Sequence, residues 1–151
     1  MSGDSGIDLP MLRSVRVLDL YRIAVEWKDG RKTEVDLAPH ILRYAIYRPL
    51  RNDLMAFKTA RLVDDGVAIE WPDVNLDMSA DAIAALHRAQ TMTATEFRER
   101  LKRLGLSFDA AAASFEISRR QIAYYSAGKK PIPRHLVLAV RGFEEELGGH
   151  D

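Results

Sequence analysis

Two kinds of hydrophobic pattern divide the chain into an N-terminal and a C-terminal part. From residue 14 to about residue 72, apolar and polar residues tend to alternate, which is the period of a half-buried β-strand. From residue 79 onward, alanine-rich segments with helical spacing replace that alternation. The pattern predicts the α+β class: a small antiparallel-sheet domain over residues 11–80, a connecting helix over 81–92, and an all-α domain over 93–148.

The N-terminal part contains two predicted β-hairpins. Apolar residues alternate from Tyr21 to Trp27, an Asp-Gly pair follows at 29–30, and residues 33–37 alternate again. Residues 60–71 repeat this arrangement around a second Asp-Gly pair at 65–66. We expect each Asp-Gly pair to form the turn, because both residues tolerate a positive φ. The segment between the two hairpins has mixed spacing and is interpreted as helical or irregular.

The C-terminal part contains four predicted helices with local start and stop signals. Their expected starts are a capping box of Thr93 and Glu96, Phe108, a second capping box of Ser118 and Gln121, and Pro133. The second helix is expected to end at Phe115, with a tight turn at Glu116 and Ile117, and the third at Gly128. The apolar stripes predicted for the first and last helices are Phe97, Leu101 and Leu104, and Leu136, Val140, Phe143 and Leu147.

The charges of the chain are segregated, although they sum to zero. The 151 residues include 22 Lys and Arg and 22 Asp and Glu. Residues 98–134 hold nine basic and three acidic side chains, which gives a net charge of +6, whereas residues 64–81 hold six acidic and no basic ones. A segregated distribution of this kind indicates that the two parts of the chain have different partners.

Composition excludes several classes of protein. The absence of cysteine rules out a disulfide framework and a Cys-based zinc site. Residues 1–10 carry Asp4 and Asp8 instead of a basic run and lead into no long apolar stretch, so we expect a loose tail rather than a signal peptide or membrane anchor. The sequence therefore predicts a cytoplasmic protein that does not enter the membrane.

No catalytic or metal site is predicted. The four histidines, His40, His87, His135 and His150, stand at no recognised metal-ligand spacing, so solvated or capping roles are expected for them. The sequence contains no glycine-rich phosphate loop and no Gly-x-Ser-x-Gly nucleophile motif. The acidic run of residues 64–81 lacks the spacing of a calcium loop, so we interpret it as a solvated hairpin and linker. We expect neither enzymatic activity nor a cofactor.

The segment from Leu106 to Pro133 resembles the Cro/repressor family of helix-turn-helix proteins without a gap. Ala112 falls where that family keeps a small residue between its two helices, and Ile117 and Ile122 fall on buried hydrophobic positions. Tyr125 falls on the usual aromatic position. Gly128 and the residues after it look like the glycine, basic loop and next helix of the family.

The resemblance implies sequence-specific binding of double-stranded DNA by a transcriptional regulator that acts as a homodimer on paired half-sites. It assigns base reading to Arg119, Arg120 and Gln121, with Tyr124 at the edge of the groove. It assigns phosphate contacts to Ser107, Ser118, Lys129 and Lys130. The alternative for the two arginines is a solvated helix face, against which the local charge of +6 weighs.

Two residues depart from the family pattern. Phe108 stands where many relatives carry a glutamine that supports the base-reading side chain. Glu116 replaces the glycine or small residue of the turn, where a positive φ is often needed and a negative charge near phosphates is unfavourable. These departures keep open a second hypothesis, a protein-interaction adaptor or antitoxin-like partner whose helix-turn-helix binds DNA weakly or not at all.

The N-terminal part is similar to a bacterial family known only as domain-of-unknown-function family 2442. The resemblance rests on the hairpin Tyr21…Trp27-Lys28-Asp29-Gly30 and on the stretch from Ala60 to Asp77, including Trp71-Pro72. It implies no activity, but it suggests a module for dimerisation or for binding a small partner protein. Structure explains the same residues more easily, with Trp27 and Trp71 as core aromatics and the Asp-Gly pairs as turns.

Overall fold

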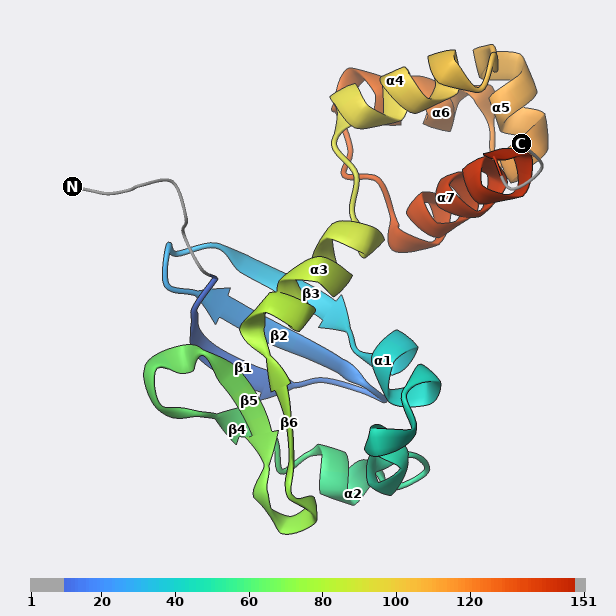
Figure 1. Ribbon diagram of the computed structural model, residues 1–151. Helices are drawn as coiled ribbons and strands as arrows, with labels where there is room; N and C mark the ends of the chain where they lie inside the picture. Colours follow the sequence, from blue (N-terminus) through green and yellow to red (C-terminus); the bar gives the residue numbers. More distant parts are fainter. Residues whose placement is uncertain (1–9, 149–151) are drawn as a thin grey trace. The chain divides into compact units, whose positions relative to one another are not determined.

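The computed structural model describes residues 10–148 and confirms the α+β class (Figure 1). Antiparallel strands make up the N-terminal part, and helices alone follow them. The chain divides into two compact units, with the boundary between His87 and Arg88. Each unit has its own hydrophobic core and is described separately.

The first sheet is a three-stranded antiparallel meander with the strand order β1-β2-β3 (Figure 1). Its strands are β1 (Leu12–Val17), β2 (Arg22–Trp27) and β3 (Lys32–Asp36). The alternation in β2 has the predicted consequence, because Ile23, Val25 and Trp27 are all buried while the residues between them face outward. The indole Nε1 of Trp27 donates to Thr33 Oγ1 at 3.0 Å, so the only polar atom of this core aromatic is satisfied.

The two hairpin turns use their Asp-Gly pairs differently. In the first, Gly30 alone has a positive φ of 93°, while the Asp29 carboxylate accepts the backbone N–H of Arg31 at 3.0 Å. The expected turn is confirmed, but only its glycine adopts the positive φ that both residues tolerate. In the second, Asp65 and Gly66 both adopt positive φ, at 71° and 76°.

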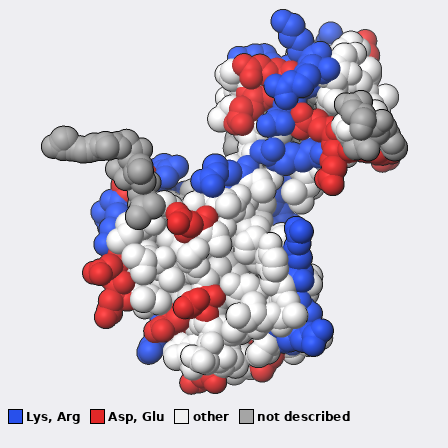
Figure 2. Space-filling model, viewed as in Figure 1, with Lys and Arg blue, Asp and Glu red and all other residues white. Residues whose placement is uncertain are grey.

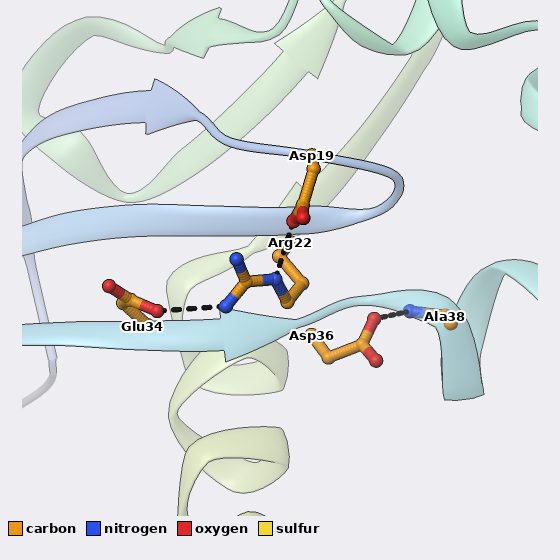
Figure 3. A network of polar contacts seen from close by, with 5 residues as sticks. All are labelled: Asp19, Arg22, Glu34, Asp36 and Ala38. Carbon is orange, nitrogen blue, oxygen red and sulfur yellow. Dashed lines mark hydrogen bonds and ion pairs between the residues drawn. The ribbon is translucent and has the colours of Figure 1, made fainter.

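Arg22 forms ion pairs with two acidic residues of the first sheet and the loop before it (Figure 3). Arg22 in β2 contacts Asp19 at 2.6 Å and Glu34 of the neighbouring strand at 3.0 Å. The hydrogen bond from Arg22 is the main cause that holds the pKa of Asp19 below its usual range. Beside it, the carboxylate of Asp36 accepts the N–H of Ala38 at 2.9 Å, so the end of the strand sets the start of the next helix.

The second sheet contains a strand that the sequence patterns do not predict. Its order is β4-β5-β6, all antiparallel, with β4 (Arg61–Leu62), β5 (Ala68–Trp71) and β6 (Leu76–Ser79). Short 3-10 helices, η3 (Asp64–Gly66) and η4 (Pro72–Val74), connect them. We interpreted the acidic run as a solvated hairpin and linker, but in β6 Asp77 is exposed while Met78 is buried in the core.

Short helices and one longer helix complete the first core. They are α1 (Ala38–Arg43), η2 (Ala45–Leu50), α2 (Leu54–Phe57) and α3 (Ala80–Gln90). Phe57 is fully buried, and its carbonyl oxygen accepts the indole N–H of Trp71 at 3.0 Å. Ile83 and Leu86 of α3 belong to the same core, so the first turns of this helix are structural elements of the N-terminal unit.

The C-terminal unit consists of helices around a small core. After the end of α3 come α4 (Ala94–Arg103), α5 (Phe108–Phe115), α6 (Arg119–Ala127) and α7 (Arg134–Gly148). Fully buried side chains from each helix meet in the core: Phe97, Ala111, Ile122, Val137 and Val140. The Thr93–Glu96 capping box is confirmed, with both reciprocal bonds present. Leu147, placed in the apolar stripe of the last helix, is instead half exposed.

Within residues 10–148, no helix has both the length and the apolar character needed to cross a membrane. Of the segment expected to be a loose tail, residues 1–10, residues 1–9 lie outside the described residues, as does His150.

Candidate nucleic-acid interface

A three-residue turn joins α5 to α6 and brings the start of one helix close to the start of the other. Ser107 caps α5 by accepting the N–H of Ala110 at 3.1 Å, and Ser118 caps α6 by accepting the N–H of Gln121 at 3.1 Å. At the C-terminal end of α5, Glu116 adopts a left-handed conformation with φ 56° and ψ 41°. Ala112 and Ile117, expected at inward positions, are only partly buried against the core, in which Ala111 of α5 and Ile122 of α6 are fully buried.

The second predicted capping box is only half formed. Ser118 makes the expected bond, but the side-chain oxygen Oε1 of Gln121 is buried and has no hydrogen-bond partner among the described residues. A complete box would need that oxygen to accept the backbone N–H of Ser118. Gln121, which the family resemblance assigns to base reading, therefore has its carbonyl oxygen turned into the protein in this conformation.

Arg119 is held by two residues from the first turn of α5. Its Nε lies 3.0 Å from Asp109 Oδ1, and its guanidinium carbon lies 5.6 Å from the centroid of the Phe108 ring. The Arg119 side chain remains 63% exposed, and that of Asp109 81%, so the ion pair is a solvated one and weak by itself. Its geometric effect is to restrict a long side chain at the exposed start of α6.

Tyr124 organises a second cationic cluster one turn further along α6. The Nε of Arg120 donates to the Tyr124 hydroxyl at 2.9 Å, and its guanidinium carbon lies 5.6 Å from the ring centroid. Lys130 places its Nζ 5.2 Å from the centroid of the same ring. Both contacts fall within the range of cation–π attraction. The tyrosine therefore keeps two cations together at the surface.

Gly128 brings the basic loop back beside α6. It ends the helix with φ 76°, and the N–H of Lys129 donates to the Tyr124 carbonyl at 3.0 Å, as in a Schellman motif. Lys129 and Lys130 are both exposed. The loop thus adds two cations to the surface that carries Arg120.

Not all of the local positive charge is available for binding. Arg98 donates to the carbonyl oxygen of Ser126, and Arg100 forms a half-buried ion pair of 2.6 Å with Glu144 of α7. These two arginines hold the helices together. Figure 2 agrees with a mixed surface, because Lys and Arg side chains run across the C-terminal unit with acidic ones beside them.

The structure brings most of the sequence-predicted site residues to one region. The contacts at or near α6 involve Arg119, Arg120, Tyr124 and Lys130. Ser107 and Ser118 cap their helices by accepting hydrogen bonds, so the caps do not use their hydroxyl protons. The sequence did not reveal Asp109 as a neighbour of Arg119. Its position in the first turn of α5 was the available signal, but using it requires the angle between the two helices.

Other candidate sites are less informative. A groove of about 410 Å³ lies on the outer face of the first sheet above Ala24, but the charged residues lining it are of both signs: Arg16, Glu26, Lys32 and Glu34. Within the described part of the chain, no group of three or more His, Asp or Glu side chains is arranged to hold a metal ion. Burial, with a smaller contribution from Arg43, lowers the pKa of His40, and this imidazole packs edge-on against Tyr44.

Comparisons with known proteins give a family for the N-terminal part and one similar solved structure over most of the chain. Residues 12–89 match a family described as protein of unknown function, DUF2442. None of the curated proteins compared with the chain matches it. Among solved structures, the chain is similar to a candidate DNA-binding protein from Nitrosomonas europaea, with 30% identity and a TM-score of 0.46, over 89% of this chain and 86% of that one. The family match ends before α4, so a function for the C-terminal unit has to be argued from its own residues.

Proposed function

The chain belongs to the DUF2442 family of proteins of unknown function, and we propose that its C-terminal unit binds double-stranded DNA sequence-specifically through α5 and α6. The observation that carries the proposal is the first turn of α6, where two exposed arginines, Arg119 and Arg120, follow directly after a short turn. A recognition helix inserts this end into the major groove, where arginine can fork onto guanine O6 and N7.

The proposed DNA-binding domain is a helix-turn-helix of the Cro/repressor type over residues 93–148. Its support is local: a three-residue turn, a left-handed residue at Glu116, and small or apolar residues, Ala111 and Ile122, in the core that α5 and α6 share. In this proposal residues 81–92 connect the domain to residues 11–80, which serve for dimerisation or for binding a small partner protein.

We propose that the protein acts as a homodimer in the cytoplasm, as a transcriptional regulator without catalytic activity or cofactor. Lys129, Lys130 and the capping serines offer few phosphate contacts, so a single domain would bind weakly. Two domains on half-sites about one helical turn apart, roughly 34 Å, double those contacts and fix the spacing of the site.

A second candidate function is a protein-interaction adaptor or an antitoxin-like partner. Two observations favour it: Glu116 places a negative charge beside the start of α6, and the carbonyl oxygen of Gln121 is turned inward. An adaptor of this kind differs from a DNA-binding protein in one measurable property. Binding through phosphates weakens steeply as salt is raised, because bound cations are released from the DNA.

The test is a selection of bound genomic fragments by the full-length protein at two salt concentrations. The proposal predicts enrichment of a paired, spaced motif that fades at high salt. A folded dimer that enriches no sequence at low salt would replace this proposal with the adaptor.

Single substitutions then separate the expected roles. Arg119→Ala should cost about 1 to 3 kcal/mol on the selected site and little on unrelated duplexes, whereas Lys129→Ala should weaken binding to all duplexes alike. Arg103→Ala is the matched control, because this exposed arginine of α4 lies 4.0 Å from Glu144 and outside the proposed interface. Equal small losses for all three variants would contradict base reading by α6.

A further inference from the structure

Two contacts restrict the orientation of Arg119, although its side chain is 63% exposed. A free arginine side chain has many rotamers, and ordering them on binding opposes affinity. Here Asp109 fixes the Nε atom at 3.0 Å and the ring of Phe108 lies 5.6 Å from the guanidinium carbon. Both residues come from the first turn of α5, which Ser107 caps. The start of one helix therefore acts as a support for a side chain of the next.

The ion pair also selects which edge of the guanidinium is presented. It uses Nε, and so it leaves the two Nη amino groups as the edge available to a ligand. Those two groups are the pair that matches guanine O6 and N7 in the major groove. Arg120 also uses its Nε, but its acceptor is the uncharged Tyr124 hydroxyl, and Lys130 lies against the same ring. Two cations side by side suit the more diffuse charge of the DNA backbone.

We propose that Arg119 reads a guanine, and that Phe108 and Asp109 are positioning residues that aim its Nη groups at that base. The inference deepens the proposed function and rests on it. Arg120, with Lys130 on the Tyr124 ring, contacts phosphate.

Asp109 should have opposite effects on the affinity for unrelated DNA and on the discrimination between bases. Asp109 offsets the positive charge of Arg119, so Arg119 adds little to non-specific attraction while it is paired. Asp109 also lies in the first turn of α5, where the helix dipole favours a carboxylate. Removing its charge should therefore strengthen binding to unrelated DNA and, at the same time, weaken discrimination at the guanine.

The experiment measures dissociation constants of full-length variants on the selected duplex and on the same duplex with the guanine replaced by adenine. We expect wild type to prefer guanine by about tenfold or more. Asp109→Asn should reduce that ratio severalfold towards the ratio of Arg119→Ala, while its affinity for unrelated duplex rises. Glu116→Gln is the matched control, because it also removes one acidic charge from this region, at a residue other than the two that contact Arg119, and it should leave the ratio unchanged.

The aromatic support is tested by a pair of substitutions at Phe108. Phe108→Tyr retains the ring and should retain the guanine preference, whereas Phe108→Leu retains an apolar side chain and should lose part of it. Thermal unfolding of each variant shows whether it is folded, and the ratio of two affinities does not depend on the fraction that is active. A Phe108→Leu variant with the wild-type ratio would contradict the role of the ring.

The outcomes distinguish this inference from the function on which it rests. If wild type binds no duplex in a salt-dependent manner, the proposed DNA binding fails and the inference fails with it. If wild type prefers guanine through Arg119 but Asp109→Asn keeps the same ratio, only the positioning role is overturned. A preference for a base other than guanine at the position where Arg119→Ala loses discrimination would overturn the assignment of the base.

Discussion

Substitutions at Glu116 can separate two effects in the turn between α5 and α6: the strain of its left-handed backbone and the negative charge of its side chain. An L-amino acid in the left-handed conformation costs about 1 to 2 kcal/mol, and Glu116 has φ 56° and ψ 41°. Glycine avoids that cost, but it loses about 0.5 to 1 kcal/mol more backbone entropy on folding. The difference predicts that Glu116→Gly stabilises the C-terminal unit by about 0.5 to 1 kcal/mol.

The charge of Glu116 has a different consequence. Glu116→Gln removes the charge and keeps the strained backbone, so its stability should stay within about 0.5 kcal/mol of wild type. Both variants should bind DNA more tightly at low salt, and the gain should shrink as salt screens the lost repulsion. Glu116→Ala provides the control for backbone strain, because alanine has a Cβ and no charge.

The assay for stability has to report on the C-terminal unit alone. Amide hydrogen exchange in α5 and α6 provides such a signal. In a domain of about 60 residues, 1 kcal/mol moves the Tm by roughly 4 to 8 °C. If Glu116→Gly is no more stable than Glu116→Ala, the backbone at this position is not strained. If DNA binding by Glu116→Gln and by wild type depends on salt in the same way, Glu116 does not repel DNA.

Two further predictions concern stability. Gly66→Ala should destabilise the N-terminal unit by about 2 to 4 kcal/mol in urea unfolding, because the new Cβ would lie 1.9 Å from the Leu12 carbonyl oxygen. In the same assay Gly30→Ala should cost only about 1 kcal/mol, because nothing lies within 4 Å of the new Cβ. The hydrogen bond from the Thr93 backbone N–H lowers the pKa of Glu96 below its ordinary 4.5. The resulting stabilisation is complete above pH 4.5 and is lost as the pH falls through the lower pKa of the folded state, so acid unfolding of Glu96→Gln should lack this contribution.

The helices of the C-terminal unit were the most predictable part of the fold, because their signals are local. The capping box at Thr93, the limits of α5 and the glycine after α6 are each set by residues within one turn of the helix end. The burial of Val137 in α7 was missed, and Leu147 was wrongly placed in the apolar stripe. Which face of a terminal helix is covered depends on how far its neighbours extend.

The second sheet was only half predictable. The sequence indicated the hairpin of β4 and β5, but not β6, because its single acidic residue, Asp77, belongs to the run interpreted as a solvated hairpin and linker. The alternation of Leu76, Asp77 and Met78 was present, but it spans too few residues to outweigh that charge signal. Strand β6 forms because it pairs with β5, an interaction that the pattern of its own four residues does not indicate.

The candidate site shows the same division between local and tertiary information. The exposed start of α6 was predicted from its residues, since Ser118 and the two arginines after it are adjacent in sequence. The contact of Arg119 with Asp109, and the ion pair of Arg100 with Glu144, join residues on different helices. Such contacts depend on helix packing angles, which short motifs do not specify.

The positions of the two tryptophans make intrinsic tryptophan fluorescence a specific probe of the N-terminal unit. The chain has two Trp residues, Trp27 and Trp71, and both are buried in the first core. Selective excitation of indole therefore follows that unit alone, whereas tyrosines lie in both units: Tyr21, Tyr44 and Tyr47 in the first, Tyr124 and Tyr125 in the second. Unfolding followed by indole fluorescence and by amide hydrogen exchange in α5 and α6 will reveal whether the two units unfold together or one after the other.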